Sequence, residues 1–213
     1  MANGDTVQSY GAIRNPVTAG QGQIALNEKS EQLMAAGLPA YTEMTRKGQA
    51  WGTMTTSAVA GLVVRPTTTA ALELFNGYPT GQKSLIVDRL FFFNLVSTNV
   101  VEGFSGWAMV TKIKSAPSSA SLTTTSLQGN KTYSGPVVNA ISTTVVDNGW
   151  FPWTQAYQKG AGGVVPFGAV IADVGGRLIV PPQCALCLHV VSSLVGQTFT
   201  QGAFWYEEQI TLE

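Results

Sequence analysis

Residues 85–96 read LIVDRLFFFNLV, and apolar residues dominate both alternating sets of this segment. Side chains of a β-strand point alternately to its two faces. One face would carry Leu85, Val87, Arg89, Phe91, Phe93 and Leu95, and the other Ile86, Asp88, Leu90, Phe92, Asn94 and Val96. A strand that is apolar on both faces needs cover on both. A second sheet can cover one face, which leaves the other for the N-terminal arm or for another subunit.

The composition of the chain on either side of this segment indicates further strands. Short runs of Val, Ile, Thr, Phe and Leu are bounded by Gly, Pro, Asn and Ser, with about 8–12 residues between turns. We expect strands near residues 51–56, 59–65, 69–76, 84–96, 104–114, 121–128, 136–146, 164–173, 176–181, 184–193 and 198–211. No helical period follows residue 50. The sequence therefore predicts an all-β fold, a jelly-roll-like antiparallel β-sandwich over residues 51–213.

Residues 1–50 differ from the rest and are expected to form an N-terminal arm. Residues 1–23 are rich in Gly, Asn, Gln, Thr and Pro, so they should be extended or ordered only against a partner. Asn27 can cap a short helix that Gly37 ends, and Pro39 can begin a second helical turn. The arm either packs on its own domain or reaches a neighbouring subunit.

The charge balance excludes several classes of protein. Charged residues make up only 11% of the 213 residues, and 12 basic side chains cancel 12 acidic ones. No net field attracts nucleic acid, and no run of 18 apolar residues is present for a membrane helix. The first residues, MANGDTVQSY, lack the features of a secretory signal, so synthesis inside a cell is expected. A neutral surface is poorly protected against self-association, which favours packing into an assembly.

The residues that most often carry chemistry are dispersed. His189, the one histidine, lies in an apolar strand and is interpreted as a core or subunit-contact residue. Cys184 and Cys187 are three apart on the same strand, so their thiols point to opposite faces and fill core positions. Glu207 and Glu208 likewise point apart. We expect no enzymatic activity, no catalytic residue, no metal site and no cofactor.

The segment Trp150-Phe151-Pro152-Trp153 is a dense aromatic cluster that the sequence predicts to be a loop. One interpretation folds this loop back over the edge of the sandwich, with its rings on the core. The other leaves Trp150, Phe151 and Trp153 free to contact a partner or a glycan. Both interpretations remain open at the level of sequence.

The order of several segments resembles a known group of proteins. The segments are Ala71–Gly77, Ser84–Phe91, Gly106–Val110, Val146–Trp153, Gly176–Pro182 and Phe204–Glu207. Together they resemble small virion structural proteins of tailed bacteriophages, the head decoration or cement proteins, over residues 50–213. The resemblance implies a jelly-roll β-domain, often a homotrimer, attached to the major capsid protein. It places the protein on the capsid surface of a virion assembled in the bacterial host cytoplasm.

A decoration protein that binds and stabilises the assembled head is therefore the expected function. Candidate core or subunit-interface residues are Phe91, Phe93, Trp107, Trp205 and Tyr206. Candidate capsid contacts in the arm are Ile24, Leu26, Leu33 and Met34. The alternatives are a host-recognition or carbohydrate-binding β-domain of the virion, and a small single-jelly-roll capsid protein.

Overall fold

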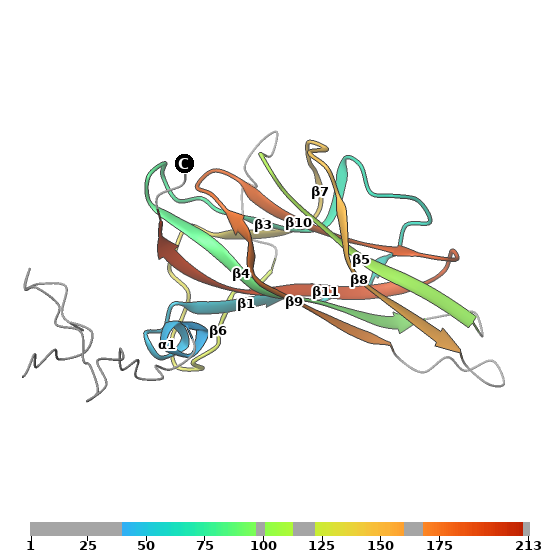
Figure 1. Ribbon diagram of the computed structural model, residues 1–213, viewed down its shortest axis with the longest axis horizontal. Helices are drawn as coiled ribbons and strands as arrows, with labels where there is room; N and C mark the ends of the chain where they lie inside the picture. Colours follow the sequence, from blue (N-terminus) through green and yellow to red (C-terminus); the bar gives the residue numbers. More distant parts are fainter. Residues whose placement is uncertain (1–39, 97–100, 113–121, 160–167, 211–213) are drawn as a thin grey trace, which may run out of the picture. The chain divides into compact units, whose positions relative to one another are not determined.

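The computed structural model describes residues 40–96, 101–112, 122–159 and 168–210 (Figure 1). These residues belong to one compact unit, Ala40–Glu213. A short helix, α1 (Ala40–Arg46), comes first and is followed only by strands. The strands are β1 (Ala50–Met54), β2 (Val59–Ala60), β3 (Thr69–Phe75), β4 (Lys83–Val96), β5 (Val101–Thr111), β6 (Thr125–Ser126), β7 (Val138–Thr144), β8 (Phe151–Lys159), β9 (Ala169–Val180), β10 (Ala185–Ser192) and β11 (Thr198–Gln209).

The strands form two sheets that pack against each other (Figure 1). The six-stranded sheet has the order β6-β1-β11-β4-β9, and β2 also pairs with β11. The five-stranded sheet has the order β7-β3-β10-β5-β8. Neighbouring strands are antiparallel in both sheets. The predicted antiparallel β-sandwich is therefore confirmed.

The connectivity is that of a jelly roll. Without β2, β6 and β7, the strands in chain order are β1, β3, β4, β5, β8, β9, β10 and β11. The six-stranded sheet then contains the first, eighth, third and sixth of these, and the five-stranded sheet contains the second, seventh, fourth and fifth. Two four-stranded sheets with this interleaved order make up the jelly-roll arrangement.

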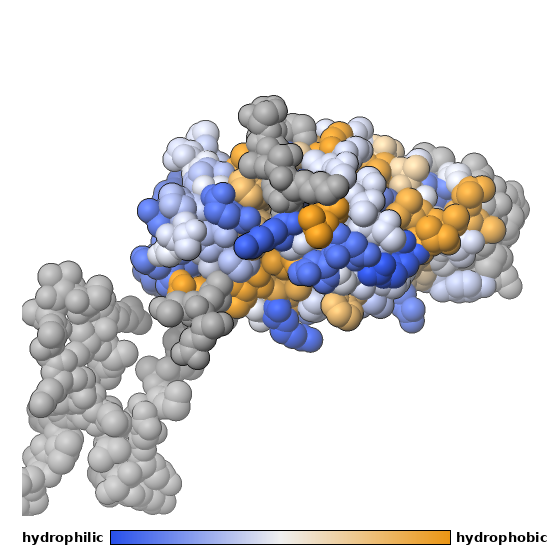
Figure 2. All heavy atoms as spheres, turned by 90° about the horizontal axis from the view of Figure 1, so that it is seen from above, coloured by the Kyte–Doolittle hydropathy of each residue, from blue (hydrophilic) through white to orange (hydrophobic). Residues whose placement is uncertain are grey.

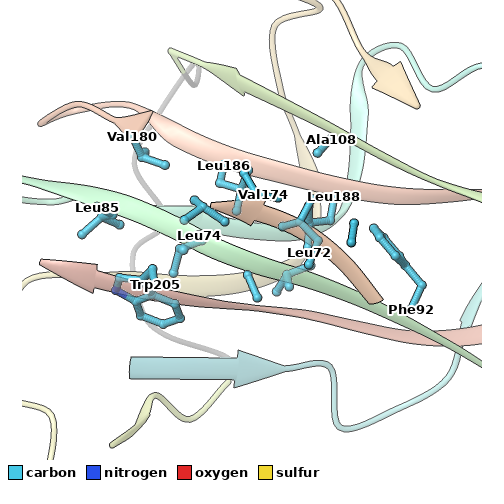
Figure 3. Packing of buried hydrophobic residues seen from close by; sticks show 14 of the residues in the cluster. Leu72, Leu74, Leu85, Phe92, Ala108, Val174, Val180, Leu186, Leu188 and Trp205 are labelled. Atoms are coloured by element: carbon cyan, nitrogen blue, oxygen red, sulfur yellow. The ribbon is translucent and has the colours of Figure 1, made fainter. Parts of the chain in front are cut away.

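The main core fills the space between the two sheets. Its largest buried side chains come from both layers and point toward one another, among them Leu72, Leu74, Leu85, Phe92, Leu186, Leu188 and Trp205 (Figure 3). Burial of these side chains is the main source of stability, because each contributes about 1.5–3 kcal/mol when removed from water.

β4 contains a bulge that changes which of its side chains reach the core. Trp205 on β11 pairs with Val87, and the preceding Phe204 pairs with Arg89, so Asp88 is an extra residue in β4. A single extra residue interrupts the alternation and bends the strand. The strict alternation expected for residues 85–96 is therefore wrong beyond Val87.

The bulge gives β4 a continuous apolar inner side. The side chains that reach the core are Leu85, Val87, Leu90 and Phe92. Phe91 and Phe93 point to the outer side of the six-stranded sheet, where they line a groove. Both sides of β4 remain apolar, as the sequence predicts, but the two sets of residues differ from the expected ones.

Four other segments depart from the expected strands. The chain from Phe151 to Lys159 forms strand β8, where a loop was expected. The segments predicted as strands 164–173 and 176–181 overlap one strand, β9, which contains Gly175 and Gly176 at positive φ. The expected strands 59–65 and 121–128 are reduced to Val59–Ala60 and Thr125–Ser126. Of the two expected short helices, the one after Pro39 is α1, and the one after Asn27 lies outside the described residues.

The contact between Phe92 of β4 and Gly106 of β5 joins the two sheets closely. A Cβ atom at Gly106 would fall on the Phe92 ring. We therefore expect Gly106→Ala to lower the free energy of unfolding by about 1–3 kcal/mol, because the core has no space for the methyl group. Urea unfolding of the purified protein measures this effect.

Gly103→Ala is the matched control, because a Cβ there would lie 3.6 Å from the Tyr157 ring, an ordinary contact distance, on the same strand. Equal stability of the two variants would contradict the proposed role of Gly106.

Candidate functional site

The outer side of the six-stranded sheet carries an open apolar groove of about 410 Å³. It crosses the sheet from β6 to β9, and its apolar lining residues are Met54, Phe91, Phe93, Leu127, Ile171 and Phe204. We call these six residues the outer apolar face. Ile171 is 57% exposed, Met54 45% and Leu127 41%. Large apolar side chains this exposed and this close together are typical of interaction surfaces.

Two glycines allow the floor of the groove to be aromatic. A Cβ at Gly202 would meet the Phe91 ring, and a Cβ at Gly52 would meet the Phe204 ring. Each glycine is also the direct cross-strand partner of the phenylalanine that covers it. The Phe91 and Phe204 ring centroids are 4.9 Å apart, so the two rings form one continuous surface.

One edge of the groove is charged. Arg89, which lines the groove, is the cross-strand partner of Asp173. The Arg89 Nε atom lies 2.9 Å from Asp173 Oδ1 and 3.8 Å from Asp88 Oδ2. The Arg89 side chain is 49% exposed and that of Asp173 is 77% exposed. An apolar centre with a polar rim is the usual anatomy of a protein interface.

The five candidate core or interface residues lie in three different places. Trp205 belongs to the main core. Phe91 and Phe93 belong to the outer apolar face, and Tyr206 points to that side of the sheet because it follows the inward-pointing Trp205. Trp107 packs against a second cluster of buried residues, associated with the five-stranded sheet. They do not form one site.

This second cluster is closed by the described chain itself. Buried side chains from β3, β5 and β10 pack there with two residues of the segment between β7 and β8. The buried members are Ala70, Phe75, Met109, Val145, Trp150, Ala185 and Cys187. In Figure 2, which looks onto the molecule from the side of the five-stranded sheet, exposed apolar residues are interrupted by hydrophilic ones. The outer side of the five-stranded sheet is therefore a mixed surface of apolar and hydrophilic residues.

Burial shifts the pKa values of two titratable groups of β10, Cys187 and His189. Burial raises the pKa of the Cys187 thiol, and the nearby Glu73 raises it further. Burial lowers the pKa of His189, whose Nδ1 atom lies against the backbone of Val190. Cys184, also a free thiol, packs against the main core instead, as the opposite orientation of the two cysteines predicts. Among the described residues, no three His, Cys, Asp or Glu side chains gather as metal ligands would.

The aromatic segment before β8 does not present its three rings on one surface. Trp150 is buried, and its Nε1 atom donates a hydrogen bond of 2.8 Å to the Thr67 carbonyl. Trp153 is half-buried and packs against the main core. Only Phe151, which is 65% exposed, is presented to solvent. This arrangement favours the interpretation in which the rings pack on the core.

A buried polar cluster that the sequence does not predict surrounds Glu207 of β11. The Tyr78 hydroxyl donates to Glu207 Oε2 at 2.8 Å, and the Tyr133 hydroxyl donates to Oε1 at 2.7 Å. Lys83 Nζ lies 3.6 Å from Oε2. Burial is the main cause that raises the pKa of both phenols, and the Glu207 carboxyl group raises it further. The tyrosines lie 129 and 74 residues from Glu207 in sequence, so no local spacing reveals the cluster.

This cluster connects separate parts of the sandwich. Tyr133 also contacts Trp51 of β1 edge-on, with ring centroids 4.8 Å apart, and its hydroxyl accepts a bond from the Val137 amide. The arrangement satisfies a buried carboxyl group and holds the end of β11.

The arm residues proposed as capsid contacts, Ile24, Leu26, Leu33 and Met34, lie outside the described residues. The outer apolar face is therefore the candidate functional site of the described chain. The sequence analysis names two of its residues, Phe91 and Phe93, as core or subunit-interface candidates. It misses Met54, Leu127, Ile171 and Phe204, which come from distant segments and meet only when the sheet forms.

No protein-family model matches the sequence, and no curated protein is found to be similar to it. Within the described ranges, no helix has the length and apolarity needed to cross a membrane.

The raised pKa values of Tyr78 and Tyr133 predict a loss of stability at alkaline pH. In the unfolded chain these phenols ionise near their ordinary pKa of about 10, whereas the folded chain keeps them protonated. Unfolding therefore becomes more favourable as the pH rises above about 10. We expect Tyr133→Phe to reduce this alkaline slope and to lower stability at neutral pH by about 1–3 kcal/mol, since Glu207 loses a donor.

Thermal unfolding at several pH values measures both effects. Tyr157→Phe is the control, because the Tyr157 side chain is exposed. An unchanged alkaline slope in Tyr133→Phe would show that Tyr133 does not contribute to the pH dependence.

Proposed function

We propose that this protein is a virion structural protein, a capsid decoration or cement protein that binds and stabilises an assembled phage head. The observation that carries the proposal is the outer apolar face on a jelly-roll domain. Jelly-roll domains are common in viral capsids, although lectins and cupins share the arrangement. The fold alone therefore does not select the function, and the surface must be considered with it.

The outer apolar face favours packing in an assembly over an isolated monomeric state. Ile171, Met54 and Leu127 expose apolar surface on one side of the sheet. The net charge of zero gives copies of the chain no long-range repulsion. Both properties suit a protein whose surface is covered after assembly.

The proposed mechanism is mechanical rather than chemical. A protein that binds the assembled shell, but not its separated subunits, stabilises the shell by mass action. In the proposal, the arm residues Ile24, Leu26, Leu33 and Met34 bind the major capsid protein. The sandwich domain packs against neighbouring copies on the capsid surface.

The strand order also favours a second candidate, a small single-jelly-roll capsid protein. The two candidates differ in what the purified chain does alone. A capsid protein forms closed shells by itself, whereas a decoration protein requires a preformed head. Electron microscopy of the concentrated protein distinguishes them.

Sedimentation with phage heads that lack this protein tests the proposal. We expect the native chain to bind these heads and to raise the temperature at which they release DNA. Replacement of Ile24, Leu26, Leu33 and Met34 together by Ser should weaken binding by tenfold or more, because about four buried apolar side chains are lost from the contact.

Val7→Ser with Ile13→Ser is the matched control, since it also removes apolar side chains from the arm. Undiminished binding by the fourfold variant would exclude these residues as capsid contacts. Failure of the native chain to bind the heads would exclude the decoration function.

A further inference from the structure

The outer apolar face can accommodate a partner surface similar to itself. Its centre is the pair of Phe91 and Phe204 rings, which are tilted against each other, and Ile171 and Met54 project beside them. The floor spans several strands, so an apolar surface as broad as a sheet can cover it. Flat sheet faces that are apolar normally pack against another sheet at a separation of about 10 Å.

The charged rim is complementary to itself. Arg89 and Asp173 are adjacent, opposite in charge and well exposed. In a two-fold contact the same surface serves on both subunits, so residue pairs are exchanged across the axis. Arg89 of one copy can then meet Asp173 of the other, and the reverse pair forms at the same time. The neutral chain adds no repulsion at longer range.

From the apolar centre and this rim we infer that the outer apolar face binds the same face of a second copy of this chain across a two-fold axis. The inference rests on the proposed function, in which copies of the chain lie together on a shell. A two-fold contact needs only this one face, whereas a three-fold ring needs a second surface complementary to it. The homotrimer implied by the resemblance would form through other surfaces.

Light scattering of the full chain over a concentration series is the primary test. We expect a species of twice the 22.5 kDa chain mass that dissociates on dilution. Ile171→Glu should abolish this species, because it places a charge within the apolar contact. Val195→Glu, at an exposed apolar position in the turn between β10 and β11, should leave it unchanged. Circular dichroism confirms that each variant is folded.

A charge exchange provides a second, independent measurement. Arg89→Asp and Asp173→Lys should each weaken self-association about tenfold, since like charges then face each other across the axis. An equimolar mixture of the two variants should restore association, because the negative face of one meets the positive face of the other. A mixture that remains as weak as its components would overturn the two-fold arrangement.

The outcomes separate this inference from the proposed function. A native chain that is monomeric at every concentration, or a dimer insensitive to Ile171→Glu, overturns the inference. If the monomer binds phage heads and Ile171→Glu abolishes that binding, the occupant is the shell protein, and the decoration function survives. If the dimer forms as expected but does not bind heads, the inference stands and the decoration function fails.

Discussion

The bulge at Asp88 in β4 is the constraint on which both the core and the outer apolar face depend. It lets Val87 before the bulge and Leu90 after it both point into the core. It also directs Phe91 to the opposite side, where the ring covers Gly202. β4 pairs with both β9 and β11, and the register of both pairings shifts at this bulge. The core and the outer apolar face therefore arise from the same local feature.

The two sides of the molecule have different relations to solvent. The chain uses its own residues, such as Trp150, to close the cluster on the five-stranded sheet. On the six-stranded sheet, Ile171 and Met54 stay exposed. The exposed apolar side chains on this side of the sheet form a surface suited to association. His189 and Cys187 are buried in β10 of the five-stranded sheet, so they are not part of this surface.

Features that depend on local pattern could be predicted from the sequence, and features that depend on distant pairing could not. Strand texture and the two-sided apolarity of residues 85–96 are local, so the β-sandwich and its additional apolar surface were predictable. The bulge at Asp88 depends on how β9 and β11 align with β4, which no local pattern encodes. β8 was missed because its residues Thr154–Tyr157 mix polar and aromatic side chains and gain their order from β5. Glu207 was recognised only as an isolated carboxylate, because both its tyrosine partners are distant in sequence.

The cluster around Glu207 has a mechanical consequence for a protein under load. β11 lies inside the six-stranded sheet, with β1 on one side and β4 on the other. Tyr78 and Tyr133 fasten its C-terminal end through short hydrogen bonds to Glu207. A pull on that end would load two ladders of backbone hydrogen bonds in shear, rather than peel one ladder open bond by bond. A strand loaded in this way resists extraction, so the domain would not unravel from this end.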